Sequence, residues 1–178
     1  KPFQPDGLWE EKSAAWKYEA DRGASLYRRS LYTYFRRTSP HPMMTTFDAA
    51  ERNTCVVRRQ STSTPLQALV LLNDPQFVEA ARQIGARVLR EGGPTAEGRS
   101  AFAFRLLTGR APVPDERSVL RRLYLEQLDL FQAHPEQADA LAPGGPEAMA
   151  GGLPRTEWAA ATALVNTLLS FDEVVFKR

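Results

Sequence analysis

Helix starts marked by a proline and a capping side chain recur along this chain, and they constrain its fold more than any other feature. The clearest is Thr64-Pro65-Leu66-Gln67, in which a threonine caps the helix, a proline opens its first turn and a glutamine can bond back to the cap. Such a capping box stabilises a helix by about 1 kcal/mol, so we predict a helix from Pro65 to about Leu72. Asp74-Pro75 repeats the signal. Two helices should therefore meet at a tight corner.

Apolar side chains follow these starts at helical spacing. The helix from Pro75 ends at Gly92-Gly93-Pro94, a third starts at its Thr95 cap, a longer one opens at Pro114, and the last opens at Pro154. The predicted buried faces are Phe77, Ala81, Ile84 and Val88; Leu120, Leu123, Tyr124, Leu128 and Phe131; and Trp158, Ala161, Leu164, Val165, Leu168 and Leu169. We expect the last of these stripes to be a main contributor to the core.

These signals predict an all-α fold, an irregular helical bundle with a long, partly irregular arginine-rich segment. A chain of 178 residues suffices for one domain that buries roughly 70% of its unfolded surface. We expect a single domain over residues 1–178, itself the C-terminal part of a larger unit. Its expected parts are a strap at residues 1–23, a helical core at 24–132, a mobile loop at 133–154 and a C-terminal helix at 155–178.

Three of these parts depend on weaker patterns. In the strap, Trp9 and Trp16 are the large anchors. Residues 133–154 hold four prolines and four glycines, so we expect them to contribute little to the core, with one helical turn near residues 137–141. A helix is favoured over residues 24–37, although the run SLYTYF is also compatible with a strand. Its apolar positions are Tyr27, Leu31, Tyr34 and Phe35.

The segment at residues 28–59 is strongly basic, with seven arginines against Asp48 and Glu51, a local net charge of +5 in a chain of net charge +2. The candidate ligand-binding residues are Arg28, Arg29, Arg36, Arg37, His41, Asp48, Glu51, Cys55, Arg58 and Arg59. Guanidinium groups bind planar oxyanions through paired hydrogen bonds, so the arginines can form a cradle for sulfate, phosphate or acidic polysaccharide. The interpretation that we favour is that they pair with Asp48, Glu51, Asp74 and helix C-terminal carbonyls and hold irregular backbone in place.

Four of these candidates could also do acid–base, nucleophilic or metal chemistry. Asp48, Glu51 and Cys55 would share one face if they lay on a helix. The interpretation that we favour makes Asp48 the N-cap of a short helix, Glu51 its capping-box partner and Cys55 a small, buried and unreactive side chain. His41, between two prolines, is expected in a surface loop. The sequence identifies no catalytic residue and predicts no metal site.

Several classes of site find no support in the sequence. A single cysteine permits neither an internal disulfide nor a C-x-x-C pair for zinc or haem, and we expect no cofactor within this chain. The phosphate-binding, dinucleotide-binding, zinc-protease and nucleophile-elbow motifs are all missing. No apolar run reaches the roughly 20 residues of a membrane span. The small net charge and the lack of a recognised motif argue against nucleic acid as a partner.

A resemblance to a known family rests on three runs: LYRRSLYTYFRRTSPHPMMTTFDAAERNTCVVRRQSTSTPLQALVLLNDPQFVEAA, FRLLTGRAP and EWAAATALVNTLLSFDEVVF. The chain resembles the planctomycete surface-protein domain of unknown function (PSD type), which lies C-terminal to cytochrome-like regions in predicted secreted bacterial proteins. The resemblance implies an extracytoplasmic location, periplasmic or at the cell surface, and N-terminal cytochrome-like regions of the same parent protein as partners. It implies no activity. Ser170 departs from the asparagine expected at that position.

Two classes of function follow. The first is a non-catalytic interaction or scaffold module of a large extracytoplasmic, cytochrome-associated protein that contacts acidic glycans. The alternative is part of a hydrolytic or redox enzyme whose site is completed by a missing N-terminal region. Aromatic side chains crowd into the first 35 residues, so we also expect an exposed apolar patch where a partner docks.

Overall fold

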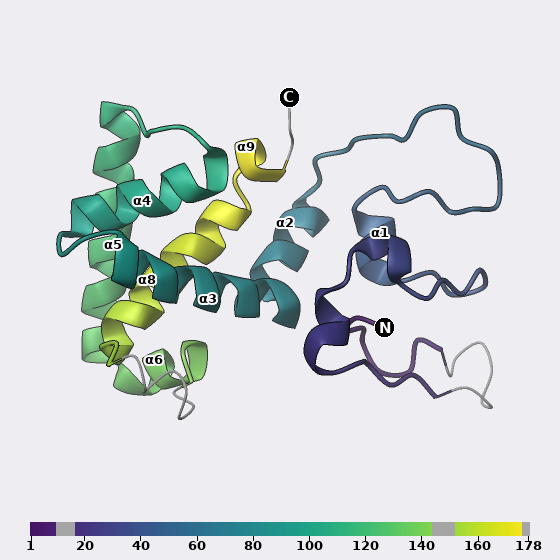
Figure 1. Ribbon diagram of the computed structural model, residues 1–178, viewed down its shortest axis with the longest axis horizontal. Helices are drawn as coiled ribbons and strands as arrows, with labels where there is room; N and C mark the ends of the chain where they lie inside the picture. Colours follow the sequence, from purple (N-terminus) through teal and green to yellow (C-terminus); the bar gives the residue numbers. More distant parts are fainter. Residues whose placement is uncertain (10–16, 144–151, 176–178) are drawn as a thin grey trace. The chain divides into compact units, whose positions relative to one another are not determined.

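The computed structural model describes residues 1–9, 17–143 and 152–175 of the chain. Within these ranges every regular element is a helix and no strand occurs, which confirms the prediction of an all-α fold (Figure 1). The chain separates into two compact units, Lys1–Val70 (unit 1) and Leu71–Arg178 (unit 2). The expectation of a single domain stays a prediction.

Unit 2 consists of helices whose starts agree with the sequence signals. The predicted C-terminal helix over residues 155–178 was wrong in its extent: it ends at Leu169, where amides of the next two residues bond to carbonyls three positions back, and a separate short helix follows. The Asp74 carboxylate accepts a hydrogen bond from the Gln76 amide at 2.9 Å, and the Thr95 hydroxyl accepts one from Gly98 at 3.1 Å. Gly109, at φ 83°, ends the next helix in the left-handed region. The helices are α3 (Pro75–Glu91), α4 (Ala96–Thr108), α5 (Pro114–Ala133), α6 (Pro135–Leu141), α8 (Arg155–Leu169) and α9 (Asp172–Val175), and α2 (Pro65–Asn73) crosses the boundary between the units.

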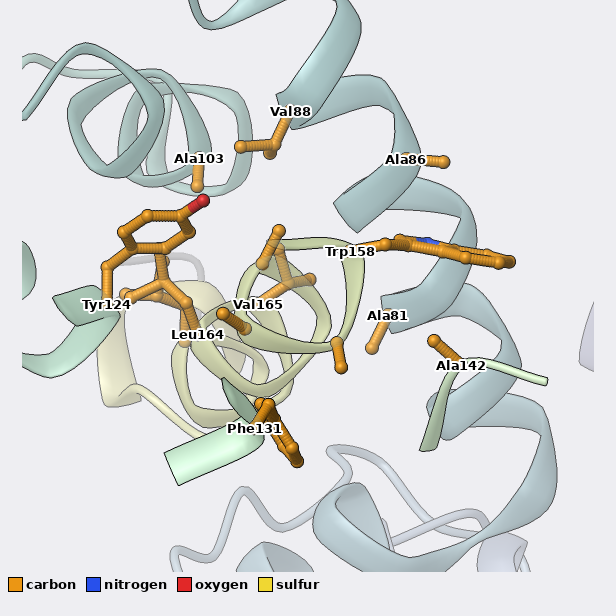
Figure 2. Close-up of a cluster of buried hydrophobic side chains, with 14 of the residues drawn as sticks. Ala81, Ala86, Val88, Ala103, Tyr124, Phe131, Ala142, Trp158, Leu164 and Val165 are labelled. Atoms are coloured by element: carbon orange, nitrogen blue, oxygen red, sulfur yellow. The ribbon is translucent and has the colours of Figure 1, made fainter. Parts of the chain in front are cut away.

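Helix α8 lies at the centre of unit 2 and packs against α3, α4, α5 and α6. Trp158, Leu164 and Val165 point into the cluster of buried side chains that α3, α4 and α5 complete (Figure 2). The prediction that this stripe is a main part of the core is confirmed. Helix α3 comes so close to α8 that a Cβ added at Gly85 would lie 2.9 Å from the backbone nitrogen of Thr162.

Helix α6 also contributes to the core, and here the prediction for residues 133–154 was wrong in part. Ala138 and Ala142 are almost completely buried against the cluster around α8. Their small side chains permit a close approach between helices, a contribution that a search for large apolar residues overlooks. Residues 144–151 of the predicted mobile loop lie outside the described residues.

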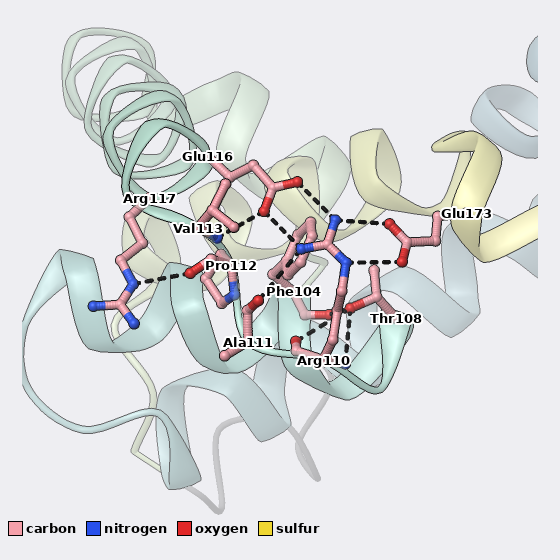
Figure 3. Close-up of polar contacts among 9 residues, drawn as sticks. All are labelled: Phe104, Thr108, Arg110, Ala111, Pro112, Val113, Glu116, Arg117 and Glu173. Carbon is pink, nitrogen blue, oxygen red and sulfur yellow. Dashed lines mark hydrogen bonds and ion pairs between the residues drawn. The ribbon is translucent and has the colours of Figure 1, made fainter.

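Two arginines connect the helices of unit 2. Arg99 on α4 donates to the Tyr124 hydroxyl at 2.9 Å and to the Glu157 carboxylate at 2.7 Å, which links α4, α5 and α8. Burial raises the pKa of Tyr124, and Arg99 opposes that shift. Arg110, in the turn between α4 and α5, forms paired hydrogen bonds with both Glu116 and Glu173, at 2.7–2.8 Å (Figure 3). The turn is thereby fixed to the start of α5 and to α9.

Unit 1 contains less regular structure. Its helical elements are the 3₁₀ turns η1 (Gly23–Tyr27) and η2 (Ser30–Tyr32), the short helix α1 (Pro42–Thr46) and the first part of α2. The predicted helix over residues 24–37 was therefore wrong. Arg28 and Thr33 have extended backbones that interrupt it, and Leu31, at 72% exposure, buries little surface that could stabilise a longer helix.

The N-terminal residues of unit 1 form a small aromatic cluster. Trp9, one of the two predicted anchors, is buried, and the ring of Tyr18 meets it edge-on with centroids 4.8 Å apart. The N-terminal ammonium pairs with Asp21 at 2.7 Å, so the two ends of residues 1–21 meet. Trp16, the second predicted anchor, lies outside the described residues.

Candidate functional site in the arginine-rich segment

His41 immediately precedes α1 and is almost completely buried. Its Nε2 lies 2.9 Å from the carbonyl oxygen of Phe3, and its own carbonyl accepts a hydrogen bond from the Thr45 amide. The prediction of a surface loop residue was wrong, because residues near Phe3 cover this position. The contact joins the N-terminal residues to the start of α1, a structural role that spacing in the sequence does not reveal.

Asp48 closes the loop that carries Arg52, Arg58 and Arg59, the C-terminal arginines of the basic segment. Its carboxylate accepts hydrogen bonds from the Thr62 amide at 2.7 Å and from the Thr62 hydroxyl at 2.9 Å. Both helical interpretations of Asp48, Glu51 and Cys55 were wrong, because no helix lies between α1 and α2. Asp48 and Arg52 have φ values of 56° and 60°, which a right-handed helix cannot include.

Glu51 and Cys55 lie in an exposed stretch between Asp48 and Thr62. The prediction that Cys55 is buried was wrong, since the flanking Val56 and Val57 are exposed as well and provide no apolar surroundings. His41 is buried whereas Glu51 and Cys55 are exposed, so the structure does not bring these three groups into one environment. Among the described residues, no group of three His, Cys, Asp or Glu side chains is arranged to hold a metal ion.

Three arginines of the segment lie over aromatic rings rather than beside carboxylates. The Arg36 guanidinium is 5.2 Å from the Trp9 ring centroid and donates to the Trp9 carbonyl at 3.5 Å. Arg52 lies 4.6 Å from the ring centroid of Phe35, and Arg29 lies 6.0 Å from that of Tyr32. Such contacts stabilise by about 0.5–1 kcal/mol at exposed sites. The predicted pairing with Asp48, Glu51 and Asp74 was wrong. Asp48 binds Thr62, Asp74 caps α3, and the exposed Glu51 forms no ion pair among the described residues.

The remaining arginines of the segment face solvent. Arg37, Arg58 and Arg59 are exposed, and among the described residues none of them makes a hydrogen bond, an ion pair or a ring contact. Arg28 is exposed near Asp21, whose pKa is lowered mainly by its hydrogen bond from the N-terminal amine and to a smaller extent by Lys1 and Arg28. These positive charges are therefore available to a partner.

Exposed aromatic side chains accompany the exposed charges. Tyr27, Tyr32 and Tyr34 each leave more than half of their surface exposed, at 67%, 62% and 59%. The Tyr34 ring also lies 5.8 Å from that of Trp9, so one of these side chains is anchored at the buried cluster. Residues 27–37, the basic aromatic segment, thus present guanidinium groups and tyrosine rings within one short irregular stretch.

The structure also shows side-chain functions that the sequence did not indicate. Gln67 forms the predicted capping box, with Oε1 accepting from the Thr64 amide at 3.1 Å. Its Nε2 additionally donates to the Thr46 carbonyl at 2.9 Å and to the Thr62 hydroxyl at 3.1 Å. Gln67 therefore joins α1, α2 and the loop closed by Asp48. The capping motif predicted the first bond, but no pattern in the sequence indicates the other two.

A family model for PSD1, described as a protein of unknown function (DUF1553), matches residues 1–124. The chain belongs to the PSD1 family. The PSD1 match covers the whole arginine-rich segment together with α3 and α4, and the family description assigns no activity. No curated protein and no solved structure matches the chain. None of the described helices is both long and apolar enough to cross a membrane.

Proposed function

We propose that this PSD1 chain is a non-catalytic interaction module that binds acidic polysaccharide through the basic aromatic segment. The observation that carries the proposal is the exposure of Arg28, Arg29 and Arg37 on the same short stretch as Tyr27, Tyr32 and Tyr34. We further propose that the module belongs to a larger extracytoplasmic protein with cytochrome-like regions, as its family resemblance implies.

The chemistry of these side chains fits a charged sugar. A guanidinium group donates two parallel hydrogen bonds to a carboxylate or sulfate, and such charge-assisted bonds are stronger than neutral ones. A tyrosine ring offers a flat apolar face with a polar tip, which suits the C–H face of a pyranose and its hydroxyl groups. Arg29, already 6.0 Å from the Tyr32 ring centroid, places both kinds of group together.

The second contact that we propose is with the cytochrome-like regions of the parent protein. Leu31 and Val57 are large apolar side chains exposed at 72% and 108%, in the part of the chain with the least regular structure. Exposed apolar residues are typical of an interaction site where they form one patch. The predicted apolar patch is supported by these side chains and by the exposed tyrosines, whereas Trp9 is buried. Its continuity stays a prediction.

Binding of polygalacturonate by the whole chain tests the proposal. The variant R28Q/R29Q/R37Q should bind at least tenfold more weakly, because it removes three exposed charges, and wild-type binding should weaken with added salt. The matched control R90Q/R121Q/R122Q removes three exposed arginines from α3 and α5 and should keep wild-type affinity.

Neutral dextran should not bind. Equal losses in both triple variants would mean that net charge alone governs binding and would overturn the proposed site. Release of new reducing ends from the polysaccharide would instead favour the alternative, a hydrolytic enzyme.

A further inference from the structure

A pocket of about 290 Å³ lies in unit 2, between the end of α3, the face of α4 and the turn that leads into α5. The lining side chains that matter chemically are Glu91, Ala101, Phe102, Arg105, Pro112 and Arg117. Small-molecule sites commonly measure about 300–1,000 Å³, so this pocket has room for a molecule built on a single ring.

Two of the lining arginines have guanidinium groups without carboxylate partners. Arg105 makes no side-chain hydrogen bond or ion pair among the described residues, and Arg117 donates only Nε, to the Pro112 carbonyl at 3.1 Å. Three other arginines of unit 2, Arg99, Arg110 and Arg155, each bind a carboxylate at 2.6–2.8 Å.

The nearby carboxylates are already occupied. Glu91 accepts a hydrogen bond from Arg87 at 2.9 Å, which lowers the pKa of Glu91 and compensates its charge. Glu116, the neighbour of Arg117 in sequence, is bound to Arg110. Figure 3 shows the Arg117 guanidinium on the other side of the turn from the Arg110 cluster. The terminal nitrogens of Arg117 and the whole guanidinium of Arg105 therefore remain available to an anion in the pocket.

Apolar groups complete the lining. Ala101, Phe102, Ala111 and Pro112 offer a surface for a flat ring. The turn that carries Ala111 and Pro112 is held by the paired hydrogen bonds of Arg110. At Gly98, another lining residue, an added Cβ would lie 2.7 Å from the Gly92 carbonyl oxygen, so the backbone of α4 packs closely against the end of α3 there. The pocket is thus preformed rather than dependent on a rearrangement.

We propose that this pocket binds a small organic carboxylate, with its ring against Phe102 and Pro112 and its carboxylate on Arg105 and Arg117. The two arginines supply charge-assisted hydrogen bonds, and the apolar groups distinguish an aromatic acid from an inorganic anion. The site uses residues of unit 2 only and is separate from the basic aromatic segment.

Calorimetric titration of the whole chain with benzoate tests this site. We expect saturable binding of about millimolar affinity, in keeping with a ligand of so few atoms. The variants R105Q and R117Q should each weaken benzoate binding at least fivefold. R121Q, an exposed arginine one helical turn along α5 that does not line the pocket, should bind as wild type. Benzyl alcohol, which lacks the carboxylate, should not bind measurably.

Three outcomes would overturn the proposal. They are no saturable benzoate binding, wild-type benzoate affinity in R105Q and R117Q with circular dichroism showing both variants folded, or tighter binding of inorganic phosphate than of benzoate. Amide shifts of Ala101 and Phe102 on benzoate addition provide a second measurement that does not depend on the variants. R105Q/R117Q should still bind polygalacturonate like the wild type, so failure of this site is distinguishable from failure of the proposed polysaccharide site.

Discussion

Arg36 and Arg110 illustrate two ways in which a single guanidinium group fixes irregular backbone in this protein. In unit 1, the Arg36 guanidinium lies over the ring of Trp9 and also donates a hydrogen bond to the Trp9 carbonyl. Arg110 lies 4.7 Å from the Phe104 ring centroid in unit 2 and adds paired bonds to two carboxylates. Arg37, Arg58 and Arg59 have neither kind of partner among the described residues. Arginines of the first kind fix backbone, whereas exposed arginines, including Arg29 beside the exposed Tyr32 ring, can bind a ligand.

At the same scale, Cys55 should react rapidly with a thiol reagent in the native protein. The side chain is exposed, and it is the only cysteine in the sequence. One equivalent of the reagent's coloured thiolate should therefore be released per chain. Stopped-flow measurement with Ellman's reagent should give a native rate within about tenfold of the rate in denaturant. Labelling that awaits global unfolding would show that Cys55 is buried and that the described loop is wrong.

Substitution of Gly85 by alanine should destabilise unit 2. In an exposed helix this change stabilises by about 1 kcal/mol, but here the new Cβ would meet Thr162 backbone atoms at 2.9 Å and 3.1 Å. Overpacking of this kind costs about 1–3 kcal/mol. Urea unfolding measures the difference, with Q83A on the exposed side of α3 as the control, expected within about 0.5 kcal/mol of wild type. A gain in stability for G85A would contradict the close approach of α3 and α8.

At the scale of elements, local sequence signals predicted a helix correctly where the interacting groups lie within the same helix or its cap. The capping side chains of Thr64, Asp74 and Thr95 act within a few residues, and the structure has each of them in place. The stripe over residues 24–37 needed a surface elsewhere to cover it. Tyr27, Leu31 and Tyr34 remain exposed, so only the short turns η1 and η2 form there and no continuous α-helix. The contacts of Trp9 with Arg36 and of Phe3 with His41 join residues far apart in sequence, and spacing alone could not reveal them.

The turn between α4 and α5 should make the stability of unit 2 depend on acid pH. Hydrogen bonds from Arg110 and the Val113 amide lower the pKa of Glu116 from its ordinary 4.5 to about 2. The Glu116 carboxylate therefore takes up a proton more readily in the unfolded chain than in the folded one. Its contribution to the free energy of unfolding is fully present above about pH 4.5 and is lost as the pH falls toward about 2.

In E116Q the pH dependence of the free energy of unfolding should be shallower over this window, as measured by denaturant titrations between pH 5 and about 2. The control is E97Q, in the first turn of α4, because the Glu97 side chain makes no hydrogen bond or ion pair among the described residues. Its free energy of unfolding should depend on pH as in the wild type. Identical slopes for wild type and E116Q would contradict the described pairing.

At the scale of the whole molecule, the two units differ in how they are stabilised. The contiguous apolar core belongs to unit 2, whereas η1, η2 and α1 bury no residue completely. Hydrogen exchange should therefore be slowest in α3, α4, α5 and α8 and much faster in η1, η2 and the loop between Asp48 and Thr62. Mass spectrometry of exchange in the whole chain measures this. Equal protection in both units would contradict the described difference.

The same division places the proposed polysaccharide contact where the chain is least regular and its charges and rings are most exposed. The decisive measurement is hydrogen exchange of the whole chain with and without saturating oligogalacturonate. We expect slower exchange confined to residues 23–37, no change in α4 and α5, and recovery of the oligosaccharide uncut. Unchanged exchange at residues 23–37, protection confined to α4 and α5, or cleavage of the oligosaccharide would contradict the proposed contact.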